Sequence, residues 1–333
     1  MDVSSGAILE RYRGGTLERA SGHVWALRER VPLAVLATPN GTVSRAGAQP
    51  SPSGTYSPDL RYAAYATSSE TLTIRDTRDG TETRMKTPYA GLGRDYWVGW
   101  PGAIWSGSGR YFTFSSGYGD QARIVMADVP TFTETLVGEP RSNRTDDSWR
   151  PGREQLVYER DGLVILYDVL SGVRTPLGPG VAPGFIANDL VVFNGAGRVS
   201  VVVEADTGRE VGRWSAPPRA AWSNGAAYRI VVSSGDCDVI VSSDGPTSAC
   251  LTRGLAYGWS PDGARLAVLR DEMPGRAALV IRAYEDGRER VLQSGLRSTP
   301  SHSCFHAEVY WSTDASRLVL LGDTNRPGDG CGL

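Results

Sequence analysis

The chain has 333 residues, of which 40% are hydrophobic, and a formal net charge of −2. This length is ample for a large buried core, and the near balance of charge leaves no basic footprint for a nucleic-acid partner. No apolar run reaches the ~18 residues of a membrane-spanning helix, so we expect none in this chain. Lys86 is the only lysine, and this preference for arginine is typical of bacterial proteins from high-GC genomes.

The N-terminal 32 residues are expected to form an extension or extra strands, with one possible hairpin at residues 8–19. Residues 1–6 lack the features of a signal peptide, and we interpret the chain as one that begins after a removed leader or membrane anchor. Residues 33–333 are expected to form one domain that opens with a hairpin at 33–45, around the turn Pro39-Asn40-Gly41.

An aromatic residue, a short hydrophilic turn and a strand recur in this order along the rest of the chain. In the clearest copy, W-S-P-D-G-A-R-L-A-V-L, proline presets φ and glycine supplies a positive φ at the turn. The apolar and β-branched run that follows is a strand pattern. The repeats are expected to begin near Tyr56, Trp105, Trp149, Phe185, Trp222, Trp259 and Trp311.

A second hairpin follows each of these strand pairs, as in the strand 164–168 with its turn at 171–172 and the strand 278–282 with its turn at 286–287. Four strands per repeat, at a period of about 20–50 residues, indicate the blades of a β-propeller. The last repeat has only two strands, and the hairpin at 33–45 would supply the missing pair. The sequence therefore predicts an all-β, seven-bladed β-propeller of four-stranded antiparallel blades, closed by N-terminal strands that join the C-terminal blade. Eight blades or six blades are the alternatives, eight because of the hairpin at 8–19.

The W-S-P-D-G-x-R-L-A-V pattern resembles the repeat of TolB-like β-propellers over residues 56–322. The resemblance implies the propeller architecture but no particular activity. The propellers of prolyl oligopeptidase relatives share this repeat, yet no α/β-hydrolase domain accompanies it here, so peptidase activity is not implied. We expect the five recurrent tryptophans to lie in the core between blades.

The four cysteines are expected to form two local disulfides. Cys237 and Cys250 flank one hairpin symmetrically, whereas Cys304 and Cys331 both belong to the last repeat. Disulfides favour an extracytoplasmic location, so we expect the protein to be secreted, periplasmic or on the cell surface. Four buried thiols in a cytosolic protein are the alternative.

The connections between successive repeats are rich in aromatic and polar residues, and in a propeller they gather on one face. A concave face that mixes aromatic rings with a few charges is the default hypothesis for a ligand site. The candidate ligand-binding residues are Tyr96, Trp97, Trp100, Asp146, Asp147, Arg219, Tyr257, His302 and His306.

The segment His302-Ser303-Cys304-Phe305-His306 is the sharpest local cluster. Residues two apart on an extended segment share a face, so His302, Cys304 and His306 are candidate ligands for zinc or copper. The competing interpretation pairs Cys304 with Cys331 and leaves the histidines as loop residues. We expect no cofactor and assign no catalytic residue, since no nucleophile and base occur at a motif spacing.

The favoured function is a non-catalytic, monomeric binding or scaffold propeller outside the cytoplasm that recognises a protein or a carbohydrate on its loop-rich face. One alternative is a metal-assisted lyase or hydrolase with a site near His302 and His306. Another is the ectodomain of a membrane-anchored sensor.

Overall fold

A computed structural model gives the fold of the chain. It describes residues 16–21, 24–28, 33–37, 43–48, 55–57, 61–68, 71–76, 78–86, 105–116, 123–138, 148–225, 227–244, 247–273, 276–297, 307–311, 315–316 and 318–322. Apart from one 3-10 turn, η2 (Ala196–Arg198), the regular structure of these residues is entirely β.

The strands are short and follow one another closely. The first fifteen are β1 (Thr16–Ser21), β2 (Val24–Arg28), β3 (Leu33–Ala37), β4 (Val43–Ala48), β5 (Thr55–Tyr56), β6 (Tyr62–Ser68), β7 (Thr71–Asp76), β8 (Glu82–Lys86), β9 (Tyr111–Ser116), β10 (Arg123–Asp128), β11 (Thr133–Gly138), β12 (Ser148–Trp149), β13 (Gln155–Arg160), β14 (Leu163–Asp168) and β15 (Arg174–Pro179). The others are β16 (Val181–Ala187), β17 (Leu190–Asn194), β18 (Ser200–Glu204), β19 (Glu210–Trp214), β20 (Ala220–Ser223), β21 (Tyr228–Ser234), β22 (Cys237–Ser242), β23 (Thr247–Leu251), β24 (Gly254–Trp259), β25 (Arg265–Met273), β26 (Arg276–Ala283), β27 (Glu289–Arg297), β28 (Ala307–Trp311) and β29 (Leu318–Gly322).

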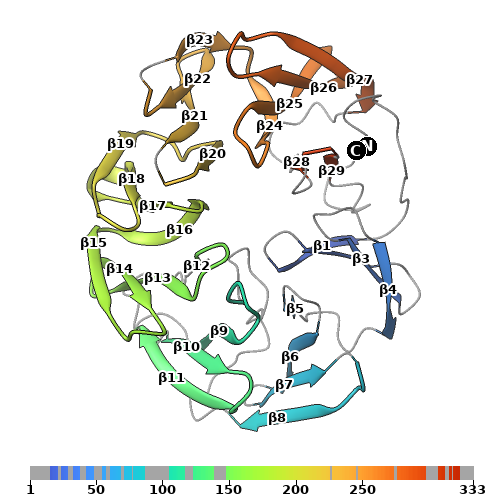
Figure 1. Cartoon of the computed structure of the whole chain (residues 1–333), viewed down its shortest axis with the longest axis vertical. Coiled ribbons are helices and arrows are strands. Elements are labelled where there is room, and N and C mark those ends of the chain that lie inside the picture. The colour runs from blue at the N-terminus through green and yellow to red at the C-terminus, as the bar shows by residue number, and fades with distance from the viewer. Residues whose placement is uncertain are drawn as a thin grey trace.

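The described strands form eight separate antiparallel sheets, and within each sheet the strands lie in chain order. Six sheets have four strands, β9–β11 has three, and β28–β29 has two. Trp105 forms an isolated bridge to Phe112 at the inner edge of the three-stranded sheet. Figure 1 shows the sheets following one another around a common centre, with the first strand of each sheet innermost. The all-β, antiparallel prediction is confirmed.

The N-terminal strands are arranged differently from the prediction. β3 and β4 pair with each other, with Leu36 opposite Ser44, but their sheet continues through β2 and β1. β28 and β29 form a sheet of their own. The expectation that 33–45 shares a sheet with the strands after Trp311 is therefore wrong for the described strands. The physical reason is β2, an apolar strand that was not recognised in the sequence and that satisfies the open edge of β3.

The serine of the recurrent turn stabilises that turn. The Ser260 hydroxyl accepts a hydrogen bond from the Arg265 N–H at 2.9 Å and donates one to Asp262 Oδ1. The hydroxyls of Ser57 and Ser106 accept equivalent backbone hydrogen bonds in two other sheets. These side chains are buried, so the serine of the recurrent turn has a structural role.

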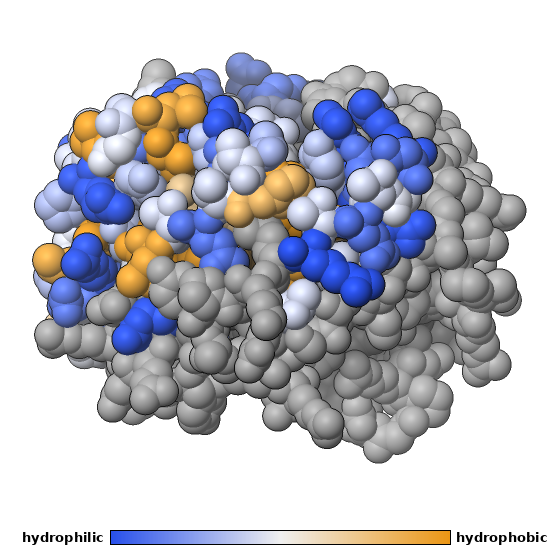
Figure 2. Space-filling model, turned by 90° about the horizontal axis from the view of Figure 1, so that it is seen from below, coloured by the Kyte–Doolittle hydropathy of each residue, from blue (hydrophilic) through white to orange (hydrophobic). Residues whose placement is uncertain are grey.

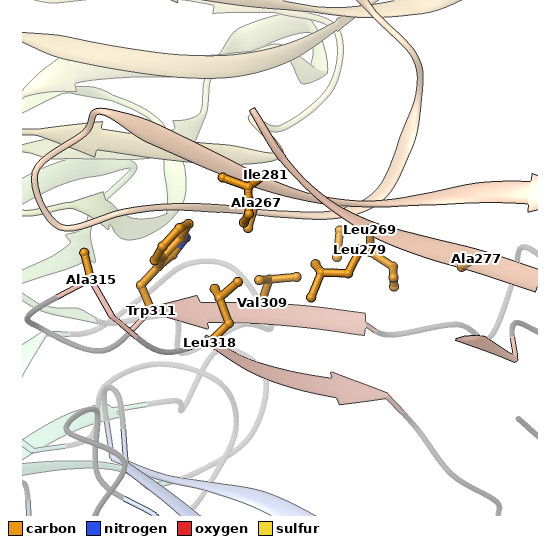
Figure 3. Close-up of a cluster of buried hydrophobic side chains, with 10 residues drawn as sticks. Ala267, Leu269, Ala277, Leu279, Ile281, Val309, Trp311, Ala315 and Leu318 are labelled. Carbon is orange, nitrogen blue, oxygen red and sulfur yellow. The ribbon is translucent and has the colours of Figure 1, made fainter. Parts of the chain in front are cut away.

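The recurrent tryptophans pack between neighbouring sheets, as predicted. Trp105, Trp149, Trp259 and Trp311 are at most 9% exposed, and Trp222 is partly buried. Figure 3 shows Trp311 among the apolar side chains that β24–β27 and β28–β29 present to each other; the labelled ones include Ala267, Leu269, Leu279, Ile281, Val309 and Leu318.

A close backbone contact completes this interface. The Trp311 indole N–H donates to the Gly258 carbonyl oxygen at 2.8 Å, and a Cβ added at Gly258 would lie 2.3 Å from the Val309 carbonyl oxygen. Only glycine allows the two inner strands, β24 and β28, to approach this closely.

On the face shown in Figure 2, small patches of hydrophobic residues are scattered among hydrophilic residues. The large hydrophobic side chains that are exposed in the described part belong to several different sheets; they are Phe132, Leu163, Leu170, Val173, Met273 and Val291. In the part of the chain that the structure describes, no helix is long and apolar enough to cross a bilayer.

Candidate functional site

Two of the nine predicted ligand-binding residues, Arg219 and Tyr257, lie in the described part of the chain. The other predicted site residues lie outside the described residues; they are Tyr96, Trp97, Trp100, Asp146, Asp147, His302 and His306, together with Cys304 and Cys331. The described site is therefore built around the two residues that can be placed.

Arg219 and Tyr257 come together between two neighbouring sheets. Arg219 directly precedes β20, the inner strand of β20–β23, and Tyr257 lies on β24, the inner strand of β24–β27 (Figure 1). The Arg219 Cζ atom is 5.2 Å from the centre of the Tyr257 ring, which is a cation–π distance. Arg219 Nη2 also donates to the Gly254 carbonyl oxygen at 2.7 Å, so it ties the start of β20 to the start of β24.

Asp238 lies beneath these two side chains and is fully buried. It accepts a hydrogen bond from the Tyr257 hydroxyl and another, at 2.8 Å, from the Ser233 hydroxyl. Arg219 Nη1 is 3.6 Å from Asp238 Oδ2. A buried carboxylate requires such partners, because its unpaired charge would cost far more than a lost hydrogen bond. The four residues form one cluster, which we call the Arg219 cluster: Arg219, Ser233, Asp238 and Tyr257.

The chemistry of the cluster is that of a hydrogen-bond network. Burial, and then the hydrogen bond to Asp238, raise the pKa of the Tyr257 hydroxyl well above its ordinary value, so it stays protonated and serves as a donor. The Gly254 N–H donates to the same hydroxyl oxygen at 2.6 Å, so the Tyr257 hydroxyl is both a donor and an acceptor. Neither Tyr257 nor the buried Asp238 is presented to solvent as a base or nucleophile. Arg219 and Ser233 are the partly exposed members, and the Ser233 hydroxyl donates its hydrogen to Asp238.

The disulfide between Cys237 and Cys250 adjoins this cluster and confirms the predicted pair. Cys237 is the residue before Asp238, and Leu251, which follows Cys250, lies opposite Asp238 in the β22–β23 ladder. A register shift follows between Asp238 and Ile240. The disulfide therefore holds the outer strand β23 to the strand that carries the buried carboxylate.

All of these groups lie at one end of their sheets. In an antiparallel meander, the connection into the first strand and the turn between the second and third strands share an end. Arg219, Gly235 and Arg253 occupy these positions, and Arg253 Nη2 donates to the Gly235 carbonyl oxygen at 2.8 Å. We call this the loop-rich end; it is the end to which the predicted connections between repeats belong.

A second buried charge cluster lies at the opposite end, between β12–β15 and β16–β19. Arg150 replaces the serine of the recurrent turn and has a fully buried side chain. Its guanidinium donates to Asp206, Asp189, Gln155 and the Asn188 carbonyl. The hydrogen bond from Arg150 lowers the pKa of Asp206. This arginine holds two sheets together.

Sequence reasoning missed Asp238 and Arg150. The available signals were local: Asp238 interrupts the alternating strand C-D-V-I-V directly after a cysteine, and Arg150 stands where the repeat has serine. Within the described residues, no group of three His, Cys, Asp or Glu side chains is arranged to hold a metal ion. The predicted cluster of His302, Cys304 and His306 lies outside them.

Comparison with known proteins supports the fold alone. No family model matches the chain, and no curated protein matches it. Among solved structures, the dihydro-heme d1 dehydrogenase NirN in complex with DHE aligns with a TM-score of 0.51 at 14% identity, over 87% of this chain and 68% of that one. An oligogalacturonate lyase in complex with manganese aligns with a TM-score of 0.49 at 12% identity, over 82% of this chain and 90% of its own. The NirN match, together with the antiparallel sheets that follow one another around a common centre, supports a β-propeller fold for this chain.

Proposed function

We propose that the protein is a non-catalytic binding or scaffold propeller that acts outside the cytoplasm and recognises a protein or a glycan at its loop-rich end. The observation that carries the proposal is the Arg219 cluster. It gives this end a rigidly held, partly exposed cation above a buried network that has no exposed base or nucleophile.

Two further features support the proposal. The Cys237–Cys250 disulfide suits an oxidising compartment, and mass spectrometry of the native, non-reduced protein should find these two cysteines linked. The ring of separate sheets presents many loops at one end without requiring the sheets to move. Eight separate described sheets favour the eight-blade alternative, and we propose that they form one TolB-like propeller domain that includes the strands before residue 33.

The location of binding can be tested with two charge reversals on the same sheet. Asp236 lies in the β21–β22 turn at the loop-rich end, and Asp244 follows β22 at the opposite end; both are exposed. Ligands selected on the wild-type protein from a peptide library and a glycan array should change in affinity with Asp236→Arg, an acidic ligand binding more tightly, and should keep their affinity with Asp244→Arg.

The reverse result would place the binding surface at the other end and contradict the proposal. An equal change in both variants would indicate a general electrostatic effect of the added arginine, which high salt would remove, and would also count against a site at the loop-rich end.

A further inference from the structure

Arg219 has hydrogen-bonding capacity that the described residues do not use. A guanidinium carries five N–H donors in a fixed, planar fork. Only one hydrogen bond is formed by this group with the described residues, the 2.7 Å bond to the Gly254 carbonyl. The nearest Asp238 oxygen is 3.6 Å away, an ion-pair distance that exceeds a hydrogen bond. The side chain is 29% exposed, so the remaining donors can reach solvent.

Arg150 shows what a purely structural arginine looks like in the same protein. Its side chain is 0% exposed, and all three of its nitrogens donate hydrogen bonds to oxygen atoms of its own chain. Both arginines join neighbouring sheets, but Arg150 has no donor capacity left over for a ligand, whereas Arg219 does. The difference between the two guanidinium groups is the observation on which the inference rests.

Arg219 is also held in place before any ligand arrives. The Tyr257 ring supports one face of the guanidinium region at 5.2 Å, and the Gly254 carbonyl and Asp238 fix its orientation. A side chain already ordered loses little conformational entropy on binding. Arg253, the residue before Gly254, is exposed and anchored through one nitrogen to the Gly235 carbonyl, so a second cation lies at the same end of the sheets.

We propose that Arg219 binds a carboxylate carried by an acidic peptide segment of a protein partner. The fork geometry of arginine matches the two oxygens of a carboxylate. A peptide is favoured over a sugar because the only ring in contact with Arg219 among the described residues, Tyr257, is buried and covered by the arginine, which leaves no exposed aromatic face there for a sugar ring. This inference rests on the proposed function, since it names the ligand of that end.

The test observes the arginine side chains directly. In the 15N-labelled full-length protein, the Nε–H resonance of Arg219 is assigned by its absence from the Arg219→Lys variant. Titration with a hexaglutamate peptide should move this resonance saturably, while the Arg150 resonance stays in place because its guanidinium is buried and saturated. A hexaglutamine peptide is the control for charge.

The Arg219→Lys variant separates the fork from the charge. It keeps the positive charge beside Asp238, so its melting temperature should stay within a few degrees of the wild type. Its affinity for hexaglutamate, measured by the shifts of neighbouring amides, should fall at least ~10-fold, because lysine cannot form the bidentate contact.

Any one of four results would overturn the inference. The first is that the shift of the Arg219 resonance does not saturate, or is no larger than that of Arg150. The second is that Arg219→Lys retains full affinity for hexaglutamate. A uronic-acid tetrasaccharide of similar charge that binds Arg219 more tightly than hexaglutamate would show that the partner class is wrong. Saturable binding of hexaglutamine near Arg253 without movement of Arg219 would reject the carboxylate site and yet leave the proposed function standing.

Discussion

Replacing Asp238 by asparagine removes the one charge that organises the Arg219 cluster and changes its shape little. The aspartate accepts from the hydroxyls of Tyr257 and Ser233 and lies at an ion-pair distance of 3.6 Å from Arg219. Asparagine keeps one acceptor oxygen. Because the Tyr257 hydroxyl already accepts the Gly254 N–H, it must donate, and so it claims that oxygen. The new amide N–H group then faces Ser233, whose hydroxyl can rotate to accept.

The hydrogen bonds survive this change, but they lose their charge. Hydrogen bonds to a charged partner contribute about 1.5–3 kcal/mol, against about 1 kcal/mol for neutral ones. Two of them weaken and the ion pair with Arg219 is lost, whereas relief from burying a charge offsets part of the loss. We expect Asp238→Asn to lower the free energy of unfolding by about 2–3 kcal/mol.

Urea unfolding of the oxidised protein, followed by tryptophan fluorescence, measures this change. Asp236→Asn is the matched control: it lies two residues earlier in the exposed turn and should change stability by less than about 0.5 kcal/mol. A double-mutant cycle with Tyr257→Phe should give a coupling energy of about 1–2 kcal/mol between the two positions.

A stability of Asp238→Asn equal to or above the wild type would refute this reasoning. It would mean that desolvation of the carboxylate outweighs its partners, so that the cluster is a net cost retained for another purpose. Zero coupling to Tyr257 would show that the two groups do not act together.

Three further predictions address packing, backbone strain and acid sensitivity. Gly258→Ala should lower the free energy of unfolding by about 3 kcal/mol or more, because the new Cβ would lie 2.3 Å from a carbonyl oxygen of β28. Gly184→Ala is the control: a Cβ there meets open space, so the melting temperature should change little. Phe132 has a φ of 54° at a turn position, so Phe132→Gly should raise the unfolding free energy by about 1 kcal/mol in urea, and unchanged or lower stability would count against strain there. The lowered pKa of Asp206 means that its contribution to stability is present above the unfolded pKa, about 3.9, and is lost as the pH falls through the folded value. Unfolding measured from about pH 5 to pH 2 should therefore show a shallower acid loss in Asp206→Asn than in the wild type, and equal slopes would contradict this.

The strand positions near the aromatic repeats could be predicted from the sequence because the signal is local. Trp259 and the turn that follows carry their own conformational preferences, and Ser260 closes that turn with hydrogen bonds a few residues away. The Cys237–Cys250 pair was predictable for the same reason, since both residues belong to one hairpin.

The features that escaped prediction depend on contacts between distant segments. Arg150 meets Asp206 across a sheet boundary and 56 positions along the chain. Asp238 is explained by its contacts with Arg219, Ser233 and Tyr257 from other segments. The sheet of β1–β4 was missed because residues 24–28 lack the repeat's turn, so nothing local marked them as the partner of β3. Pairing of strands is a tertiary choice that the hydrophobic pattern constrains only weakly.

The claim that this is a binding propeller and not a metal-assisted enzyme is tested most directly by the metal content of the purified full-length protein. Protein isolated without chelators, incubated with zinc and then dialysed against metal-free buffer should carry well under one equivalent of zinc or copper by elemental mass spectrometry. The account predicts the same value for His302→Ala and His306→Ala. One equivalent of metal that is retained through dialysis and lost in both histidine variants would contradict the account and favour the metal-assisted lyase or hydrolase.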